Sequence, residues 1–181
     1  MRRPSRDRAP ARRGLTHVDA RGVLRMVDVS GKAASAREAE AGGSLTMNRD
    51  AFSALARGAL AKGDALALAR AAGIAAAKRT PDLIPLCHVV PLQHVGVDIR
   101  LDRPRRAVRV TATARAFWST GVEMEALVAA TAALLTLYDM AKALDRAMIV
   151  GPVRLLRKSG GRSGRFVAAG SVRERAGRPR R

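Results

Sequence analysis

The sequence is poor in aromatic side chains and in cysteine. Phe, Trp and Tyr make up 3% of the 181 residues, although 48% of the residues are hydrophobic. Ala, Leu and Val must therefore fill the core, which predicts slender helices that pack closely together. Cys87 is the only cysteine, so a disulfide within the chain is excluded and a reducing compartment is expected.

A hydrophobic run long enough to cross a membrane is also missing. The longest apolar stretch, residues 126–138, falls short of the roughly 20 residues that span a bilayer. No apolar segment follows Arg2 and Arg3, which argues against an export signal. These absences predict a soluble cytoplasmic protein without a membrane partner.

Acidic residues are few, since 15 Asp and Glu stand against 34 Lys and Arg and give a formal net charge of +19. Residues 1–13 hold six Arg and one Asp, and residues 170–181 hold five Arg and one Glu. We predict disordered basic tails at 1–13 and 168–181 on either side of a single domain at 14–167. Such tails can bind nucleic acid, but no aromatic residues lie among their arginines to stack on bases, so nucleic acid is not the favoured partner.

Two alternating segments predict a β-hairpin. Apolar and polar residues alternate over 94–101 and again over 107–117, with turn-forming residues at 102–105 between them. Further strands are expected at 23–30, at 37–47 with an interruption at Gly42 and Gly43, and at 153–156.

Helices are expected between these strands. Asn48 and Asp64 are suited to cap helices over 49–60 and 65–78, and the proline-edged segment 82–92 should be a fixed extended loop. With the long helix described next, this order predicts an α+β fold. It is a ferredoxin-like sandwich in which an antiparallel sheet has helices packed on one face.

The segment 120–148 predicts a long helix that is apolar nearly all round and therefore buried. Thr120 and Glu123 have the spacing of a capping box at its start. Near its end Asp139 and Lys142 share one helix face in a dry setting, where shifted pKa values suit general acid–base work. An ordinary salt bridge at the end of a helix fits the same spacing.

Other residues could contact a substrate. Glu123 and Glu125 are two of only five glutamates, and a solvated first helical turn is the alternative reading. His88 follows Cys87 in the proline-rich segment, where a substrate contact and a buried structural histidine both fit. With one Cys and three His in the chain, a zinc site is not favoured, and no metal site is expected.

Several cations lie where they could bind an anion. Lys62 stands just before a helix, and the loop 158–164 combines two cations with glycines and serines. Lys32 and Arg37 form a third basic stretch. Together they predict a small polyanionic substrate, such as a nucleotide triphosphate.

Six segments together are more specific than any one of them. They are LTHVD (15–19), MVDVSGKAASAREA (26–39), KGDALALARAAGIAAAKRTPDLIPLCH (62–88), TGVEMEAL (120–127), LYDMAKAL (137–144) and IVGPVRLLRKSGGRSG (149–164). These segments resemble the molybdenum cofactor biosynthesis protein C family, the cyclic pyranopterin monophosphate synthases. The resemblance covers about residues 15–166 without large gaps.

The resemblance implies an activity and an assembly. The substrate would be 3′,8-cyclo-7,8-dihydro-GTP, supplied by an upstream radical GTP cyclase, and the products would be cyclic pyranopterin monophosphate and pyrophosphate. Family members resemble a ferredoxin-like fold and form a homohexamer, a trimer of dimers, with sites at the dimer interface. The family needs no cofactor for this step, and the presence of Mg²⁺ with the triphosphate is left open.

The resemblance also implies roles for individual residues. The catalytic residues would be Asp139, Lys142 and Lys62. Substrate contacts would come from Leu86, Cys87, His88, Glu123, Met124 and Glu125. Basic positions around the phosphates would be Lys32, Arg37, His17 and Lys158.

Two positions depart from the family pattern. Val89 stands where the family usually has a proline, which puts the rigidity of that loop in doubt. Phe117-Trp118-Ser119 replaces a polar, basic stretch, which removes a phosphate contact or thickens an interface. Neither departure touches the expected catalytic residues, so activity should survive.

Overall fold

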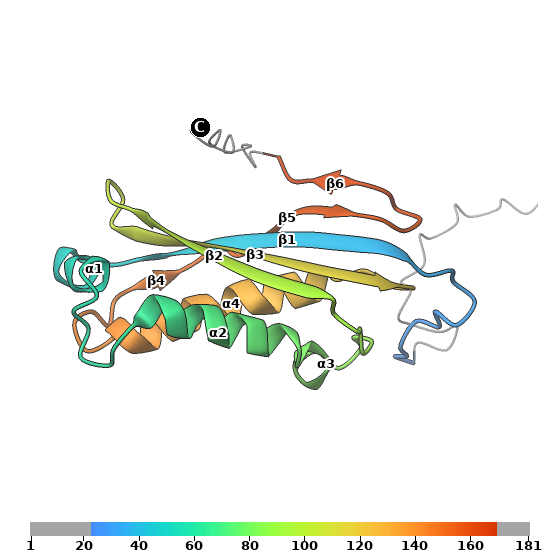
Figure 1. Ribbon diagram of the computed structural model, residues 1–181, viewed down its shortest axis with the longest axis horizontal. Helices are drawn as coiled ribbons and strands as arrows, with labels where there is room; N and C mark the ends of the chain where they lie inside the picture. Colours follow the sequence, from blue (N-terminus) through green and yellow to red (C-terminus); the bar gives the residue numbers. More distant parts are fainter. Residues whose placement is uncertain (1–22, 170–181) are drawn as a thin grey trace, which may run out of the picture.

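The computed structural model describes residues 23–169 and consists of one antiparallel sheet with α2 and α4 packed on one face (Figure 1). The strand order is β2-β3-β1-β5-β6, and β4 pairs with β1 beside this path. The strands are β1 (Ser35–Thr46), β2 (His94–Asp102), β3 (Ala107–Trp118), β4 (Ile149–Val150), β5 (Arg154–Ser159) and β6 (Phe166–Val167). The helices are α1 (Arg49–Ala56), α2 (Ala65–Ala77), α3 (Thr80–Leu83) and α4 (Glu123–Ala141). The predicted α+β ferredoxin-like sandwich is confirmed.

Residues 1–22 and 170–181 lie outside the described part of the chain. They include His17 and nearly all of the two tails expected from the sequence. The domain boundaries at 14–167 therefore stay a prediction.

Small side chains bring the two main helices and the sheet close together. A Cβ atom added to Gly73 of α2 would lie 2.8 Å from the backbone oxygen of Ala129 in α4 and 3.0 Å from Val97 Cγ2 in β2. Most of the fully buried residues are alanines, with Leu134 and Leu137 among the few large ones. The close packing expected from an Ala-rich, aromatic-poor sequence is confirmed.

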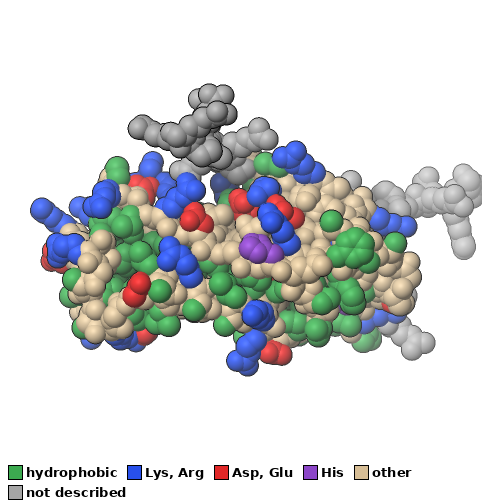
Figure 2. All heavy atoms as spheres, viewed as in Figure 1, with side chains coloured by type: hydrophobic (Ala, Val, Ile, Leu, Met, Phe, Trp, Pro, Cys, Tyr) green, Lys and Arg blue, Asp and Glu red, His purple; other side chains and the backbone are tan. Residues whose placement is uncertain are grey.

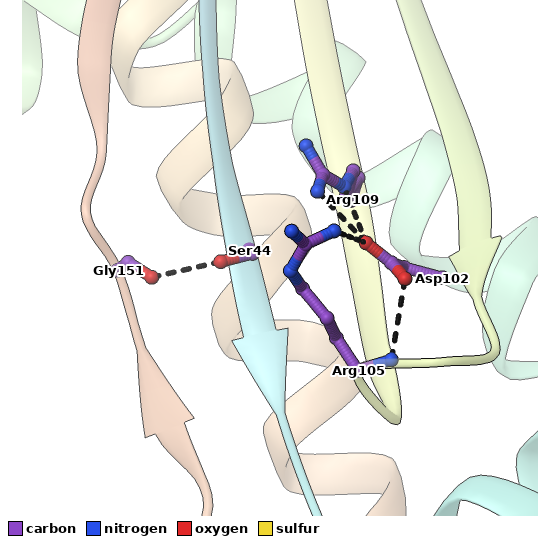
Figure 3. Close-up of polar contacts among 5 residues, drawn as sticks. All are labelled: Ser44, Asp102, Arg105, Arg109 and Gly151. Carbon is purple, nitrogen blue, oxygen red and sulfur yellow. Dashed lines mark hydrogen bonds and ion pairs between the residues drawn. The ribbon is translucent and has the colours of Figure 1, made fainter.

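The predicted β-hairpin is present. β2 pairs with β3 in an unbroken register from His94 opposite Arg115 to Asp102 opposite Ala107. At the turn, the Asp102 carboxylate pairs with the guanidinium groups of Arg109 and Arg105 and accepts a hydrogen bond from the Arg105 backbone N–H (Figure 3). These contacts, the bond from Arg109 first, hold the pKa of Asp102 below its usual value.

Both expected helix caps are confirmed. Asn48 Oδ1 accepts a hydrogen bond from the backbone N–H of Ala51 at 2.9 Å, and Asp64 Oδ1 accepts two at the start of α2. The first helix is shorter than expected, because the chain leaves α1 at Ala56 and turns through Gly58 at a φ of 66°. The segment 82–92 is only partly an extended loop, since its first residues belong to α3.

Two strand predictions need correction. Residues 23–30 do not form a strand, and only Leu24 makes an isolated bridge. The strand expected at 37–47 is longer and is not interrupted at Gly42 and Gly43. A Cβ on Gly43 would lie 2.9 Å from both Leu134 Cδ1 and Val153 Cγ2, so this glycine makes room for packing and does not break the strand.

The ends of the long helix also differ from the prediction. α4 starts after Val122 without a side-chain cap, and the Thr120–Glu123 capping box is absent, because the N-cap position falls on Val122, two residues after Thr120. The Glu123 carboxylate lies 4.0 Å from Lys158 Nζ. The helix ends at Ala141 and not at 148. Beyond it, the Leu144 carbonyl accepts a hydrogen bond from the Asn48 side chain, which draws the chain away from the helix axis.

Within residues 23–169, α4 is the one helix that is long and apolar enough to cross a membrane. The sequence analysis held that the apolar residues 126–138 are too few to span a bilayer. That argument was wrong on length, because these residues lie within a 19-residue helix. Half of the apolar window is buried inside the protein, where α4 packs on α2, β1 and β3. The helix thus occupies the position of a core helix.

Candidate functional site

A cavity of about 310 Å³ opens at the N-terminal end of α4. Its walls come from the first turn of α4, the loop after α3 and the segment that precedes β1. The lining residues are Val27, Val29, Lys32, Leu86, Cys87, His88, Val90, Thr120, Gly121, Glu123, Met124 and Glu125. The fold thereby brings seven of the thirteen nominated site residues into one cavity.

Five lining residues were not anticipated from the sequence: Val27, Val29, Val90, Thr120 and Gly121. Four of them lie within segments that carry the family resemblance. Apolar and small side chains have no chemical signature of their own, so only the fold could show that they form a wall.

His88 holds one wall of the cavity in place. Its Nε2 atom lies 2.7 Å from the backbone oxygen of Val27, and a carbonyl oxygen only accepts hydrogen bonds. Nε2 is therefore the donor in this bond. The segment before β1 is tied to the loop after α3 through this contact.

The carboxyl group of Glu125 is buried in the cavity wall, with 3% of the residue exposed. Burial, and then the charge of Glu123, raises its pKa above the usual value. Burial, and then the proximity of Glu125, also raises the pKa of the Cys87 thiol. This side of the cavity therefore favours uncharged groups.

Lys158 and Arg37 lie beside the cavity. The Lys158 ammonium contacts Ser163 Oγ and approaches the Glu123 carboxylate. Arg37 donates from Nε to the Trp118 backbone oxygen at 3.0 Å and from Nη2 to the Ser119 oxygen at 3.1 Å. Arg37 thus fixes the segment that leads into α4, and it does so through main-chain atoms that the departure at 117–119 leaves unchanged.

A second group of nominated residues, which we call the Asp139 cluster, consists of Lys62, Asp139 and Lys142. Asp139 Oδ1 lies 2.6 Å from Lys142 Nζ, and Oδ2 lies 2.7 Å from Lys62 Nζ. Lys62 also donates to the Asp139 backbone oxygen at 3.0 Å, which satisfies a carbonyl in the last turn of α4. Hydrogen bonds from Lys142 and then Lys62 lower the pKa of Asp139 to about 2.

The dry setting expected for Asp139 and Lys142 is wrong for the single chain. Their side chains are 54% and 51% exposed, and that of Lys62 is 46% exposed. The last turn of α4 buries Leu137, Met140 and Ala141, so positions 139 and 142 face outward. A helix that is apolar nearly all round in sequence still has an outer face.

The two groups lie at opposite ends of α4. Sixteen residues separate Glu123 from Asp139, which corresponds to about 24 Å along a helix axis at about 1.5 Å per residue. The structure therefore brings the expected catalytic residues together in the Asp139 cluster, and it brings most of the expected substrate-binding residues together at the cavity. Within one chain it does not join these two groups.

We expect that acid abolishes the stabilisation that the ion pairs of the Asp139 cluster give to the fold. The Asp139 pKa is lower in the folded chain than its ordinary 3.8, so the folded state binds fewer protons. Its contribution is fully present above about pH 4 and is lost as the pH falls toward about 2. Urea unfolding of the wild type and Asp139→Asn checks this, since the difference between their midpoints should shrink over that window. A difference that stays constant from pH 6 to pH 2 would contradict it.

No metal cluster is apparent in the part of the chain that the structure describes. Residues 23–169 contain no group of three or more His, Cys, Asp or Glu side chains placed to hold a metal ion. The cations at the cavity, Lys32 in its lining and Lys158 beside Glu123, are groups that suit an anion.

The surface charge is mixed rather than collected into a single basic groove. Figure 2 shows Lys and Arg side chains spread over the visible face, with carboxylates among them. Some of the arginines on the sheet are paired, as in Arg115 with Glu38 at 2.7 Å and Arg157 with Glu40 at 2.8 Å. Charges interspersed in this way are typical of a solvated surface.

Fold and site together define an α+β protein with a cavity at one end of α4, cations beside that cavity, and a carboxylate held between two lysines at the other end. The chain belongs to the MoaC family, whose model matches residues 26–161.

Three relatives illustrate what the chain is similar to. A cyclic pyranopterin monophosphate synthase of Roseiflexus castenholzii is 56% identical over 153 residues, which cover 84% of this chain and 97% of the relative. Proteins of the same name from Methylobacterium sp. (strain 4-46) and Parvibaculum lavamentivorans are 53% and 51% identical. These matches cover 85% and 87% of this chain, and 96% and 99% of the respective relatives.

Proposed function

We propose that the chain is a cyclic pyranopterin monophosphate synthase, a lyase of molybdenum cofactor biosynthesis. Its substrate is 3′,8-cyclo-7,8-dihydro-GTP, and its products are cyclic pyranopterin monophosphate and pyrophosphate. The observation that carries this proposal is the family match over residues 26–161, together with relatives of that name that share more than half of the aligned residues.

The cavity suits the ring system of this substrate. Its volume of about 310 Å³ lies at the lower end of the range for small-molecule sites, about 300–1,000 Å³. Lys32 lines the cavity and Lys158 stands next to Glu123, so positive charge is available for the phosphates. Loss of pyrophosphate builds negative charge on the leaving group, and ammonium groups stabilise that charge.

The Asp139 cluster supplies the proton transfers. Rebuilding a purine into a pterin moves protons on and off nitrogen and carbon. With a pKa of about 2, Asp139 is ionised at neutral pH and carries no proton to give. We therefore assign proton transfer to Lys62 and Lys142, and we assign to Asp139 the role of holding the two ammonium groups in place.

A complete site requires a second copy of the chain. The cavity and the Asp139 cluster are about 24 Å apart along α4, too far for one small substrate to touch both in the same chain. Two chains related by a two-fold axis near the middle of α4 would place the cavity of one beside the Asp139 cluster of its partner.

The outer face of the helices supports such a dimer. Leu135 of α4 and Leu68 of α2 are each about half exposed. Thr131 and Thr136 donate their hydroxyl groups to the carbonyl oxygens one turn earlier, Leu127 at 2.9 Å and Ala132 at 2.8 Å. Their polar groups are thus satisfied within α4, which leaves methyl groups for a dry interface. A homohexamer, a trimer of such dimers, is the assembly that the family resemblance implies.

The surroundings of the reaction are part of the same proposal. The protein works in the cytoplasm on the product of an upstream radical GTP cyclase. It needs no cofactor of its own, and any Mg²⁺ arrives with the triphosphate. The single Cys87 fits a reducing compartment.

A coupled assay tests the proposed function. The full chain is mixed with the product of a radical GTP cyclase, and the reaction is followed by pterin fluorescence after oxidation and by pyrophosphate release. Both signals should rise together in equal amounts. Absence of both with a freshly prepared substrate would overturn the assignment, and pyrophosphate without a pterin would indicate another triphosphate lyase.

A further inference from the structure

The two lysines of the Asp139 cluster come from segments that are far apart in the sequence. Lys142 is the first residue after α4, and Lys62 lies between α1 and α2. Both side chains are about half exposed, so burial in the core does not fix where their ammonium groups lie. Their positions therefore depend on how the main chain of the two segments is held.

Asn48 and Asp145, which we call the clasp, connect the start of α1 to the loop after α4. Asn48 Nδ2 donates to the Leu144 backbone oxygen at 3.2 Å, and Asp145 Oδ2 accepts the Asn48 backbone N–H at 2.7 Å. The other carboxylate oxygen, Oδ1, accepts the Ala147 backbone N–H at 2.9 Å. Hydrogen bonds to a carboxylate are stronger than those between neutral groups. The clasp thus closes the loop that begins at Lys142.

The α1 side of the clasp is connected to Lys62 by a turn that is hydrogen-bonded past the end of the helix. The backbone bonds of this turn run from Gly58 to Leu55, from Ala59 to Ala54 and from Gly63 to Leu60. Leu60, two residues before Lys62, is 7% exposed and anchors the turn in the core. A constraint at Asn48 is therefore passed on to the main chain of Lys62.

The other side of the clasp is connected to Lys142 through the end of α4. The Lys142 backbone N–H donates to the Tyr138 oxygen at 2.9 Å, which fixes the start of the loop. The Tyr138 hydroxyl donates to the Arg146 backbone oxygen at 2.9 Å, which fixes its far end. The loop that carries Lys142 is thus held to α4 at both ends and to α1 in between.

We propose that Asn48 and Asp145 are positioning residues, which hold Lys62 and Lys142 at the two oxygens of the Asp139 carboxylate. This inference rests on the proposed function, in which the two lysines transfer protons. A misplacement of about 1 Å can cost about a hundredfold in rate, so exposed lysines need a fixed main chain. Neither clasp residue lines the cavity, so the clasp acts on turnover and not on the binding of the ring.

Asn48→Ser separates the clasp from the helix cap. Serine caps a helix about as well as asparagine, but its one short hydroxyl, bound to the Ala51 N–H, does not reach the Leu144 oxygen. Asp145→Ala removes both bonds of the carboxylate. In the coupled assay with the full chain, we expect each variant to lower kcat roughly tenfold and to change KM by less than about twofold. Added to Asp139→Asn, the same changes should have no further effect, because the residues act as a unit.

Controls separate positioning from stability. Ser44→Ala also removes a side-chain bond to the main chain, from Ser44 Oγ to the Gly151 oxygen at 2.8 Å, but on a segment without a lysine (Figure 3). It should keep the wild-type kcat. Asp145→Asn keeps one acceptor oxygen, so its kcat should lie between those of Asp145→Ala and the wild type. Urea unfolding shows that each variant is folded under the assay conditions.

Crystal structures supply a measurement that does not depend on activity. The wild type should show Lys142 Nζ and Lys62 Nζ at the two oxygens of Asp139, and Asp145→Ala should lose at least one of these contacts. Unchanged contacts in Asp145→Ala, an unchanged kcat in both clasp variants, or an equal fall in kcat in Ser44→Ala would overturn the inference.

The proposed function is judged separately by the wild type. Wild-type turnover with an unchanged kcat in the clasp variants removes the role of the clasp and leaves the synthase assignment standing. Absence of wild-type turnover overturns the synthase assignment, and the contacts in the crystal structures then decide alone whether the clasp positions the two lysines.

Discussion

Asp139→Asn is expected to lower kcat for cyclic pyranopterin monophosphate formation by roughly a hundredfold to ten-thousandfold, the range that acid–base groups contribute. The carboxylate lies 2.6 Å from Lys142 Nζ and 2.7 Å from Lys62 Nζ, and it is the one group that holds both ammonium ions. An amide has no charge with which to offset their repulsion, so the two lysines separate. The coupled assay of pterin and pyrophosphate measures the effect.

The loss should be catalytic and not structural. The three side chains of the Asp139 cluster are about half exposed, and ion pairs with that exposure contribute little to stability. Asp98→Asn is the matched control. Asp98 Oδ2 lies 2.8 Å from Arg100 Nε in an exposed ion pair, and this pair belongs to neither group of site residues. It should retain wild-type turnover. Near-wild-type turnover by Asp139→Asn, or loss of its assembly, would defeat the assignment.

Mixing two inactive variants is expected to restore activity. His88→Ala damages the cavity, and Asp139→Asn damages the Asp139 cluster at the other end of α4. If each site combines the cavity of one chain with the cluster of its partner, a mixed dimer has one intact site and one site with both defects. Random pairing of equal amounts then yields about a quarter of the wild-type sites before purification, and about half of them in dimers that carry both variants.

The mixture is prepared by co-expression with two affinity tags and purified over both. The two variants expressed alone give the background. A mixture of His88→Ala with Cys87→Ala serves as the negative control, because both changes damage the same cavity and no dimer regains an intact site from them. Activity at the background in the His88→Ala and Asp139→Asn mixture would mean that the two groups do not act together across chains.

Local features were predictable because they depend on neighbours in the sequence. The alternation over 94–101 and 107–117 gave the hairpin, and Asn48 and Asp64 capped their helices as expected. Predictions failed where distant contacts intervene. Gly43 reads as a strand breaker, yet Leu134 and Val153 fill the space beside it. Thr120 reads as a cap, yet the N-cap position falls on Val122, and the Glu123 carboxylate lies 4.0 Å from Lys158 Nζ, 35 residues away in the chain.

The candidate site was predictable only in part. The family resemblance named the residues, but neither resemblance nor spacing could show that α4 keeps them in two groups at its two ends. Periodicity likewise predicted burial for the whole helix, because an apolar sequence does not indicate which face of the helix stays exposed to solvent in a single chain. Asp139 and Lys142 lie on that side.

The sequence by itself determined the layers of the fold, its close packing and the kinds of side chain available for chemistry. These properties follow from local periodicity, capping and residue size. The tertiary structure alone decided which groups meet: it buried Glu125, tied His88 to Val27 and placed Asp139 between two lysines. Burial and electrostatic interactions depend on distance in space, and distance in space is set by how the sheet and helices pack.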